Sequence, residues 1–325
     1  MQNEVILEAR QIKKYFPIHS GVLLKHTGNV RAVDGVSFTV RKGETLGLVG
    51  ESGCGKSTLG RTLLRLYEPT AGDIVYKGSV INGLSKQQLK PIRRHLQMIF
   101  QDPYESLNPR MTAASIVAEP FQIHRIGTKT EQRERTVELF KQVGLKTAQL
   151  NSYPHEFSGG QRQRISIARA IALNPDVLIC DESVSALDVS VQAQILNLLR
   201  ALQDELHMTY VFISHDLSVI EHLCTRIVVM YLGKIVELTD RDTLFDQPLH
   251  PYTQALIDAV PVAGRGRRRR GKVLQGDVPS PINPPSGCHF HPRCPRRLDR
   301  CAGEAPELIA PKNHDDHWVS CWLYQ

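Results

Sequence analysis

The chain has 325 residues, 41% of them hydrophobic, which is enough for one large globular domain with an appendage. No stretch approaches the roughly 18 uninterrupted apolar residues of a membrane span, and the opening Met-Gln-Asn-Glu lacks the layout of a signal peptide, so we expect a cytosolic protein. The net charge is +7, but five arginines fall within 265–270, which argues against a nucleic-acid-binding face spread over the fold.

Alternating apolar residues predict two strands near the start of the chain, over 3–9 and 30–40. Between them, Pro17–Gly28 is polar and contains glycine, so we expect a loop there. Phe16 stands just before this loop. Its ring is a candidate for stacking on adenine, although an aromatic residue that closes a strand is as often part of the core.

The segment from residue 50 to 58 reads G-E-S-G-C-G-K-S-T and matches the phosphate-loop pattern G-x-x-x-x-G-K-[ST]. A short apolar strand precedes it and a helix follows it, which is the context that the motif needs. Glycines let backbone N–H groups turn toward phosphate oxygens, and the helix N-terminus adds partial positive charge. The sequence therefore predicts a nucleoside triphosphate site, in which Lys56 reaches the β- and γ-phosphates and Ser57 holds Mg²⁺. Its residues are Gly50, Glu51, Ser52, Gly53, Cys54, Gly55, Lys56, Ser57 and Thr58.

A strand over 95–100 ends in Gln101, whose side-chain amide is able to ligate Mg²⁺ or orient water. The proline-punctuated segment after it opens a helical block that runs to about residue 144. Within this block, 130–143 has the spacing of an amphipathic surface helix. The helical block interrupts an otherwise alternating pattern of strands and helices.

A second anion-binding helix end is predicted where the chain reads F-S-G-G-Q, from Phe157 to Gln161. The anion would meet Ser158, Gly159, Gly160 and Gln161 at the start of a helix over 161–173. On its own this motif is weak, because S-G-G-Q is usually only a helix cap.

Paired acids end the buried strand that begins at Asp176. A strand-end carboxylate holds Mg²⁺ in phosphate-loop enzymes, which suits Asp181, and the adjacent Glu182 is placed to polarise water. The alternative is a solvated pair of acids in a turn.

The chain continues with Ser185-Ala-Leu-Asp188, a helix from Val189 to about His207, and a strand over 210–214 that runs into His215. Ligands collect beyond strand ends in nucleotide-binding sheets, although a histidine there is often merely a surface residue. Strands over 226–230 and 234–238 complete the core near Asp240.

Seven cysteines in a cytosolic chain are not expected to form disulfides. Three are scattered through core-like segments, whereas the last 40 residues hold Cys288, Cys294, Cys301 and Cys321. Their spacing is neither that of zinc ribbons nor that of bacterial ferredoxins, yet a metal would stabilise a segment with little apolar content. Iron–sulfur, zinc and unligated thiols all stay open at this point.

The order of these motifs resembles the nucleotide-binding domain of ABC transporters over about residues 5–240. The resemblance implies an α/β phosphate-loop NTPase with a RecA-like core, an antiparallel β subdomain and an α-helical subdomain over about 102–160. It implies ATP and Mg²⁺ as cofactors, with Ser57, Gln101 and Asp181 as magnesium ligands. The remaining roles it assigns are the catalytic base at Glu182, the switch histidine at His215, the D-loop ending in Asp188, and adenine stacking at Phe16.

Two positions depart from the family pattern. Phe157 replaces the usual leucine of the signature motif, which we expect to alter packing only. Ser183 replaces the proline that usually follows the paired acids, which frees a backbone N–H and removes some rigidity beside Glu182.

In such domains one chain carries half of each catalytic site. The resemblance implies a head-to-tail dimer in which ATP lies between the phosphate loop of one subunit and Ser158 of the other. Glu182 would polarise the attacking water, His215 would contact the γ-phosphate, and Gln101 would report the nucleotide state to membrane subunits.

A narrower resemblance covers the C-terminal part. The segments beginning at His250 (H-P-Y-T-Q-A-L) and Leu274, with the later cysteines, resemble ATP-binding subunits of dipeptide and oligopeptide importers, closest to the F-type subunit of dipeptide permeases. We therefore expect an ATPase domain over 1–240, a linker with the arginine run over 241–271, and a small cysteine-rich extension over 272–325. The resemblance implies that the four cysteines hold a 4Fe-4S cluster, with Zn²⁺ as the alternative.

The expected function is an ATPase subunit that energises import of dipeptides or oligopeptides from the cytoplasmic face of the membrane. The expected partners are a sister ATP-binding subunit, two permease subunits and an external peptide-binding protein, and no nucleic acid. Two alternatives remain: import of nickel chelates or another small solute, and a soluble ABC protein acting on nucleic acid.

Overall fold

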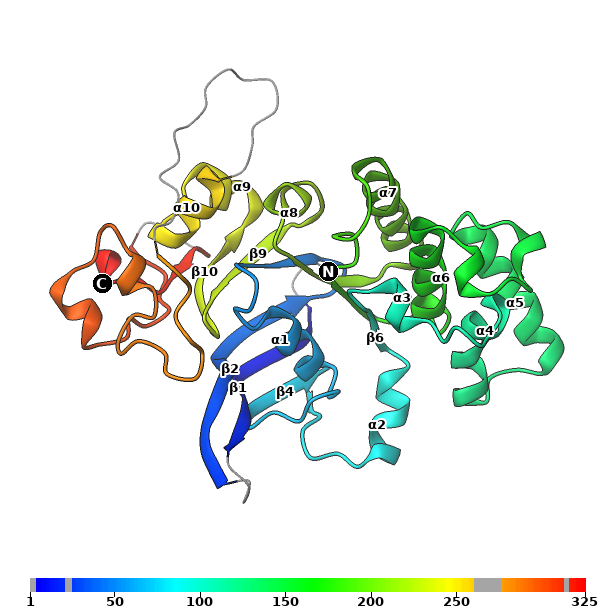
Figure 1. Ribbon diagram of the computed structural model, residues 1–325, viewed down its shortest axis with the longest axis horizontal. Coiled ribbons are helices and arrows are strands. Elements are labelled where there is room, and N and C mark those ends of the chain that lie inside the picture. The colour runs from blue at the N-terminus through cyan, green and yellow to red at the C-terminus, as the bar shows by residue number, and fades with distance from the viewer. Residues whose placement is uncertain (1–3, 21–24, 260–275, 313–315) are drawn as a thin grey trace. The chain divides into compact units, whose positions relative to one another are not determined.

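A computed structural model describes residues 4–20, 25–259, 276–312 and 316–325 (Figure 1). The chain divides into two compact units, one made of Met1–Asn82 with Ser214–Gln325 and the other of Gly83–Ile213. Each unit is described in turn below.

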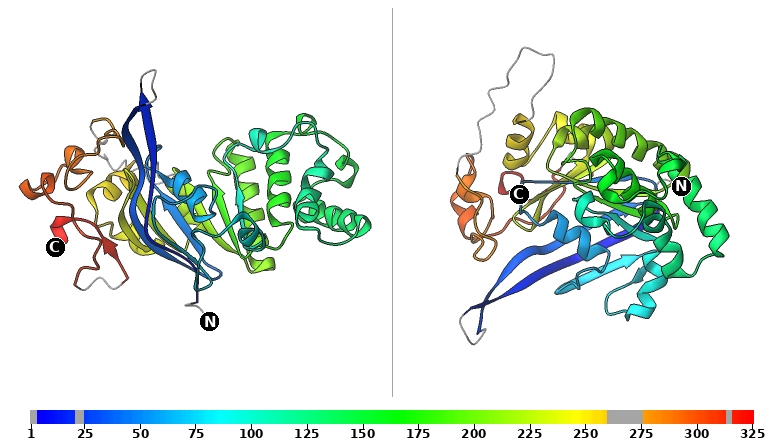
Figure 2. Two further views of the ribbon diagram at one scale, coloured as in Figure 1. Left: turned by 90° about the horizontal axis from the view of Figure 1, so that it is seen from below. Right: turned by 45° about the vertical axis from the view of Figure 1, so that its right-hand side comes forward.

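The first unit contains an antiparallel sheet with strand order β2-β1-β4-β5. Its strands are β1 (Val5–Ser20), β2 (Lys25–Arg41), β4 (Ala71–Tyr76) and β5 (Ser79–Val80). Strands β1 and β2 pair along their whole length and form one long curved ribbon (Figure 2). The loop predicted over 17–28 is therefore wrong for most of its length.

Pro17 explains how a strand runs through a segment that reads as a loop. Strand β4 pairs with β1 only as far as Lys13, so Pro17 pairs on one side only, with Asn29 of β2. A proline is tolerated in a strand where one edge carries no ladder, because its missing N–H is not needed there.

The first unit also contains part of a second sheet, with neighbours in the order β11-β10-β9-β3. Its strands are β3 (Thr45–Val49), β9 (Arg226–Tyr231), β10 (Lys234–Asp240) and β11 (Trp318–Val319). Strand β3 runs parallel to β9, and the other pairs are antiparallel. All five residues of β3 are buried, as its apolar sequence predicts.

Four helices belong to the same unit: α1 (Lys56–Leu63), α8 (Leu217–Leu223), α9 (Arg241–Asp246) and α10 (Pro251–Asp258). The last two lie in the segment expected to be a linker. The arginine run of that segment falls within 260–275, outside the described residues.

The second unit is built on three parallel strands in the order β8-β7-β6. These are β6 (Leu96–Ile99), β7 (Val177–Asp181) and β8 (Thr209–Ser214), whose final serine already belongs to the first unit. The helices are α2 (Lys86–Arg93), α3 (Pro103–Ser106), α4 (Ala113–His124), α5 (Lys129–Gln142), α6 (Gly159–Ile171) and α7 (Val189–Leu206), with 3₁₀ turns η1 (Thr147–Gln149) and η2 (Pro154–Glu156). The predicted helices over 130–143, 161–173 and 189–207 are confirmed as α5, α6 and α7.

Residues 276–325 are here called the C-terminal extension, and its described parts, 276–312 and 316–325, contain little regular structure. They form three 3₁₀ turns, η3 (His291–Arg293), η4 (Asp299–Ala302) and η5 (Trp322–Tyr324), and strand β11. An aromatic cluster anchors the extension, because Phe290 packs against Tyr231, Tyr252 and His250 with ring centroids 5.2, 5.4 and 5.6 Å away. The extension is therefore joined to β9 and α10 through this cluster.

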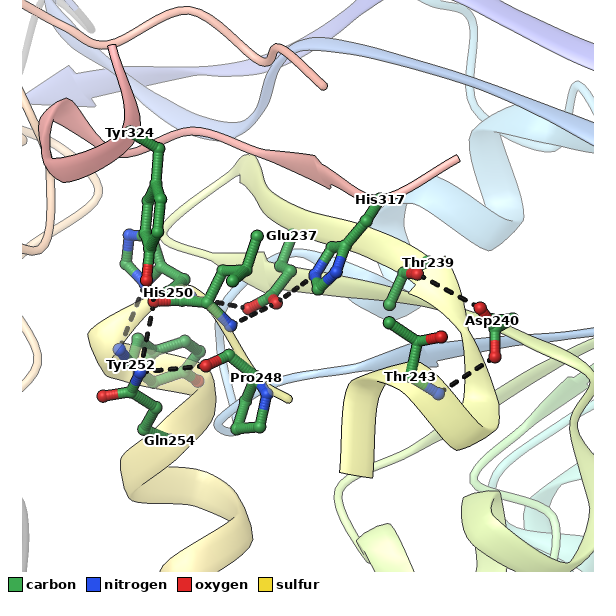
Figure 3. Close-up of polar contacts among 11 residues, drawn as sticks. Glu237, Thr239, Asp240, Thr243, Pro248, His250, Tyr252, Gln254, His317 and Tyr324 are labelled. Atoms are coloured by element: carbon green, nitrogen blue, oxygen red, sulfur yellow. Dashed lines mark hydrogen bonds and ion pairs between the residues drawn. The ribbon is translucent and has the colours of Figure 1, made fainter. Parts of the chain in front are cut away.

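A buried carboxylate holds the start of α10 against β10 (Figure 3). Glu237 has no exposed surface, and it accepts the backbone N–H groups of Leu249 and His250 at 2.7 and 2.9 Å. His317, beside β11, contacts the same carboxylate at 2.7 Å through Nε2. A buried carboxylate needs such partners, since an unpaired one would be costly to desolvate. Glu237 thus joins β10, α10 and the extension.

His250 caps α10 as a neutral imidazole. Its Nδ1 accepts the backbone N–H of Tyr252 at 3.1 Å, and Pro251 occupies the first helical position, where its missing N–H costs nothing. Burial lowers the pKa of His250 to about 4, and Glu237 acts in the opposite direction. In the unfolded chain a histidine titrates near 6.5.

This difference predicts a pH dependence of stability. Below about pH 6.5 the unfolded chain gains a proton at residue 250 that the folded protein does not bind until about pH 4, so the unfolding free energy falls across that interval by about 3 kcal/mol. The variant His250→Asn keeps a capping acceptor but cannot titrate. Urea unfolding at several pH values should show a flatter pH dependence for this variant than for the wild type.

The matched control is His222→Asn, on an exposed residue of α8. It should retain the wild-type pH dependence. An unchanged slope in His250→Asn would show that the acid sensitivity arises elsewhere.

Candidate nucleotide site

The phosphate loop connects β3 to α1, and two of its glycines, Gly50 and Gly55, leave no room for a side chain. Gly50 and Gly55 have φ angles of 151° and 106°, a region that residues with a Cβ avoid. A Cβ at Gly55 would lie 2.0 Å from the carbonyl oxygen of Ala32, and one at Gly50 would lie 2.2 Å from that of Met230. The loop therefore packs directly against the backbones of β2 and β9.

Lys56 lies inside this loop. Its side chain is buried, and its Nζ donates to the carbonyl oxygens of Gly50 at 2.7 Å and of Glu51 at 3.0 Å. These bonds hold the ammonium group at the centre of the loop, beside the N-terminus of α1. Phosphate oxygens would replace the neutral carbonyls as acceptors, and hydrogen bonds between charged groups are the stronger kind.

The paired acids of the second unit stand where the sequence placed them. Asp181 is the buried last residue of β7, and Glu182 follows it with a φ of 44°, in the left-handed region. The backbone N–H of Glu182 donates to the carbonyl of Ile213 at 3.0 Å. Such a conformation in a residue other than glycine costs on the order of 1–3 kcal/mol and is most often found at functional sites.

The structure brings two of the predicted catalytic residues together. The side-chain amide of Gln101 donates to Glu182 Oε2 at 2.9 Å. Ser183, which replaces the usual proline, is buried. The carboxylate of Glu182 is therefore oriented by a neighbouring side chain as well as by its own backbone.

Ser158 caps α6 in a capping box with Gln161. The backbone N–H of each residue is bonded to the side chain of the other, at 3.0 and 3.4 Å. Gly160 lies against α7, where a Cβ would come within 2.5 Å of Val191 Cγ1. Ser158 and Gly159 are exposed, so this helix end is open to an anion. Phe157 is buried, in keeping with a packing role.

Three further predicted residues lie at the surface. Phe16, on β1, is partly exposed and packs edge-to-face against Tyr67, with ring centroids 5.4 Å apart. His215 is exposed and directly follows β8 in the first unit, and Asp188 is the exposed N-cap of α7. The predicted site residues are thus divided between the two units.

The four C-terminal cysteines all have free thiols. None of the seven cysteines is in a disulfide. Burial is the main cause that raises the pKa of Cys288 to about 11, and Cys301, Cys321 and Cys294 contribute smaller amounts to that rise. Arg296 opposes the rise at Cys294 and Cys321, so a cation lies beside the thiols. Cysteine thiolates are soft ligands of the kind that iron and zinc take, so the residue types, rather than their arrangement, suit a thiolate-ligated group.

Within the described ranges, no three His, Cys, Asp or Glu side chains form a set that could hold a single metal ion. His289 and His291 bond through Nδ1 to the carbonyls of Leu232 and Cys288, and His317 contacts Glu237. His314 lies outside the described residues.

Sequence reasoning missed one set of contacts to the phosphate loop. Arg293 of the C-terminal extension pairs with the carboxylate of Glu51, and Tyr252 of α10 accepts the backbone N–H of the same residue at 2.8 Å. The H-P-Y sequence was a signal for Tyr252, but no spacing relates residue 51 to residue 293.

Comparison with known proteins gives a consistent result. A family model described as "ABC transporter" matches residues 33–185, and one described as "Oligopeptide/dipeptide transporter, C-terminal region" matches residues 236–301. The chain is 56% identical to the oligopeptide transport ATP-binding protein AppF of Bacillus subtilis, over 99% of this chain and 98% of that protein. It is 53% identical to a probable peptide ABC transporter ATP-binding protein of Sinorhizobium fredii, over 94% and 87%.

Solved structures match the cassette part of the fold. The dimeric structure of MJ0796, a bacterial ABC transporter cassette, aligns with a TM-score of 0.65 at 29% identity and covers 73% of this chain and 99% of that one. The cbiO1 protein of Clostridium perfringens aligns with a TM-score of 0.63 at 25% identity, over 75% and 92%.

The phosphate-loop geometry predicts that two glycines respond differently to alanine. Gly53, with a φ of 79°, has nothing within 4 Å of an added Cβ, so Gly53→Ala should lower the unfolding free energy by only about 1 kcal/mol. Gly55→Ala adds a backbone clash, so it should cost more than about 3 kcal/mol. Urea unfolding without nucleotide compares the two. Equal costs would contradict the close contact with Ala32.

Proposed function

Because this chain belongs to the family of ABC transporter ATP-binding proteins with an oligopeptide/dipeptide-type C-terminal region, we propose that it drives the import of dipeptides or oligopeptides. The chain is a phosphate-loop ATPase. The observation that carries the proposal is 56% identity to a named oligopeptide transport protein along the whole chain, H-P-Y region included. In this protein that region is built into the fold through Glu237 and Tyr252.

Within one chain, the phosphate loop would bind the triphosphate and Lys56 would contact its β- and γ-phosphates. Ser57, Gln101 and Asp181 would hold Mg²⁺, which neutralises the charge that develops during phosphoryl transfer. Glu182 would polarise the attacking water, oriented by Gln101 at 2.9 Å. Phe16 would stack on the adenine and His215 would contact the γ-phosphate.

Two cassettes would complete each ATP site. The open N-terminus of α6, with Ser158, Gly159, Gly160 and Gln161, would face the γ-phosphate bound to a partner, next to the D-loop ending in Asp188. MJ0796, a solved cassette of this fold, is dimeric. The partner here would be a sister ATP-binding subunit. Two permease subunits and an external peptide-binding protein would complete the importer.

The proposed location is the cytoplasmic face of the cell membrane, by attachment to the permease subunits. Among the residues that the structure describes, no helix combines the length and the apolar character that crossing a bilayer requires. Gln101 opens the segment that leads into α3 and α4, so this helical part is the proposed contact with the permease.

Peptide uptake by the assembled transporter tests the function. In membrane vesicles, Glu182→Gln should retain ATP binding while ATP turnover falls at least about 100-fold and uptake of a labelled dipeptide stops, because the attacking water is no longer activated. Glu205→Gln, on an exposed glutamate of α7 in the same unit, is the control and should transport normally.

Undiminished turnover in Glu182→Gln would remove that residue from the mechanism. Uptake of nickel chelates in place of peptides would replace the proposed substrate. Recovery of the chain with nucleic acid in high salt, rather than with permease subunits, would overturn the importer itself.

The proposal extends to the C-terminal thiols, which would ligate a 4Fe-4S cluster through Cys288, Cys294, Cys301 and Cys321. The presence of four soft ligands within one short segment supports it, as does the cation of Arg296 near Cys294 and Cys321. Such a cluster would stabilise a segment that contains little regular structure. Zn²⁺ remains the alternative occupant.

Metal and sulfide analysis of protein purified without oxygen tests this assignment. A 4Fe-4S site predicts about four irons and four acid-labile sulfides per chain, and Cys294→Ser should lower both and reduce thermal stability. Cys224→Ser is the control, since that buried cysteine lies outside the extension. One zinc without sulfide would replace the cluster with a zinc site, and full stability without metal would show that the thiols are not ligands.

A further inference from the structure

We propose that the C-terminal extension and α10 together set the affinity of the phosphate loop for nucleoside triphosphate by holding Glu51, with Arg293 of the extension and Tyr252 of α10 as positioning residues. The inference rests on the ATP site of the phosphate loop and not on which solute is transported.

Glu51 is held at all three of its polar groups. Its carboxylate accepts two hydrogen bonds from the guanidinium of Arg293, at 2.6 and 3.0 Å. Its backbone N–H donates to the hydroxyl of Tyr252 at 2.8 Å. Its carbonyl oxygen accepts Lys56 Nζ at 3.0 Å. One residue of the loop therefore connects the ammonium that meets phosphate to the C-terminal extension.

The two residues that hold Glu51, Arg293 and Tyr252, are themselves fixed by their neighbours. Arg293 has a side chain only 6% exposed, and its Nη1 lies 3.4 Å from the hydroxyl of Tyr231. Tyr231 and Tyr252 are fully buried and pack together with Phe290. A two-bond pair between arginine and carboxylate fixes direction as well as distance. The extension thus presents Arg293 to the loop in one orientation.

Charge gives this contact its effect on nucleotide binding. Glu51 places a negative carboxylate in a loop whose ligand is an anion, and the Glu51 side chain is 26% exposed. Arg293 neutralises that charge at contact distance. Removing the guanidinium leaves an uncompensated negative charge near the bound phosphates, which at the effective dielectric of a protein surface weakens binding of a polyanion by about tenfold.

The backbone hydrogen bonds of Glu51 contribute to nucleotide affinity in addition to its charge. Tyr252 turns the N–H of Glu51 toward α10, and the carbonyl of the same residue points to Lys56. If the N–H or the carbonyl of Glu51 loses its partner, the backbone of the loop becomes free to rotate. Nucleotide binding must then order the loop, which lowers the affinity. Variants in the extension should therefore act on nucleotide affinity and not on the rate of the chemical step.

Nucleotide affinity of the full-length chain tests the proposal. The dissociation constant for a fluorescent ATP analogue with Mg²⁺ should rise about tenfold in Arg293→Gln and should stay near the wild-type value in Arg297→Gln, an exposed arginine of the same segment. Arg293→Lys keeps the charge without the two-bond geometry and should recover part of the loss. In the assembled ATPase, Arg293→Gln should raise KM and leave kcat within about twofold.

A double variant separates charge compensation from general support of the fold. Glu51→Gln combined with Arg293→Gln removes both charges, so it should recover most of the affinity that Arg293→Gln loses. Wild-type affinity in Arg293→Gln, or a double variant that binds as weakly as Arg293→Gln, would overturn the proposal. Tyr252→Phe, which removes only the hydroxyl, provides a second test if Arg293→Gln does not fold, and wild-type affinity there would also count against it.

Discussion

The close fit of the phosphate loop against two neighbouring strands is the constraint on which the first unit depends. Gly55 and Gly50 would each clash if they carried a Cβ, one with the carbonyl of Ala32 and the other with that of Met230. The loop therefore takes its shape from β2 and β9 as well as from its own sequence. Lys56 is held within that shape by two loop carbonyls, so the positive charge is in place before a ligand arrives.

In the second unit, the strained backbone conformation belongs to a residue other than glycine. Glu182 adopts a left-handed conformation with a buried strand before it and the buried Ser183 after it. The hydrogen bond from its N–H to Ile213 of β8 and the contact from Gln101 both fix it. The orientation of this carboxylate is thus set by its neighbours in the sheet and by Gln101.

Local patterns in the sequence predicted the parts of the protein that local interactions form. The phosphate loop, the buried strand β7 and helices α5, α6 and α7 all follow from residue spacing and capping. Strand β1 continues past Pro17 because only one of its edges is paired there, a fact about neighbours that no window of sequence contains. Glu237 reads as a surface charge, yet it is fully buried because α10 and His317 supply its donors. The pair between Glu51 and Arg293 joins residues 242 positions apart.

The pairing of β10 with β11 has a consequence for synthesis of the chain. Glu237 and His317 are 80 positions apart, so a ribosome exposes the edge of β10 well before the strand that covers it has been made. During that interval β10 has unpaired backbone N–H and C=O groups along this edge, and the carboxylate of Glu237 lacks its contact with His317. An exposed strand edge of this kind can pair with a strand of another chain. A nascent chain stalled in this interval would therefore be more prone to aggregation than the finished protein, and protection of this one edge by a chaperone would raise the yield of folded molecules.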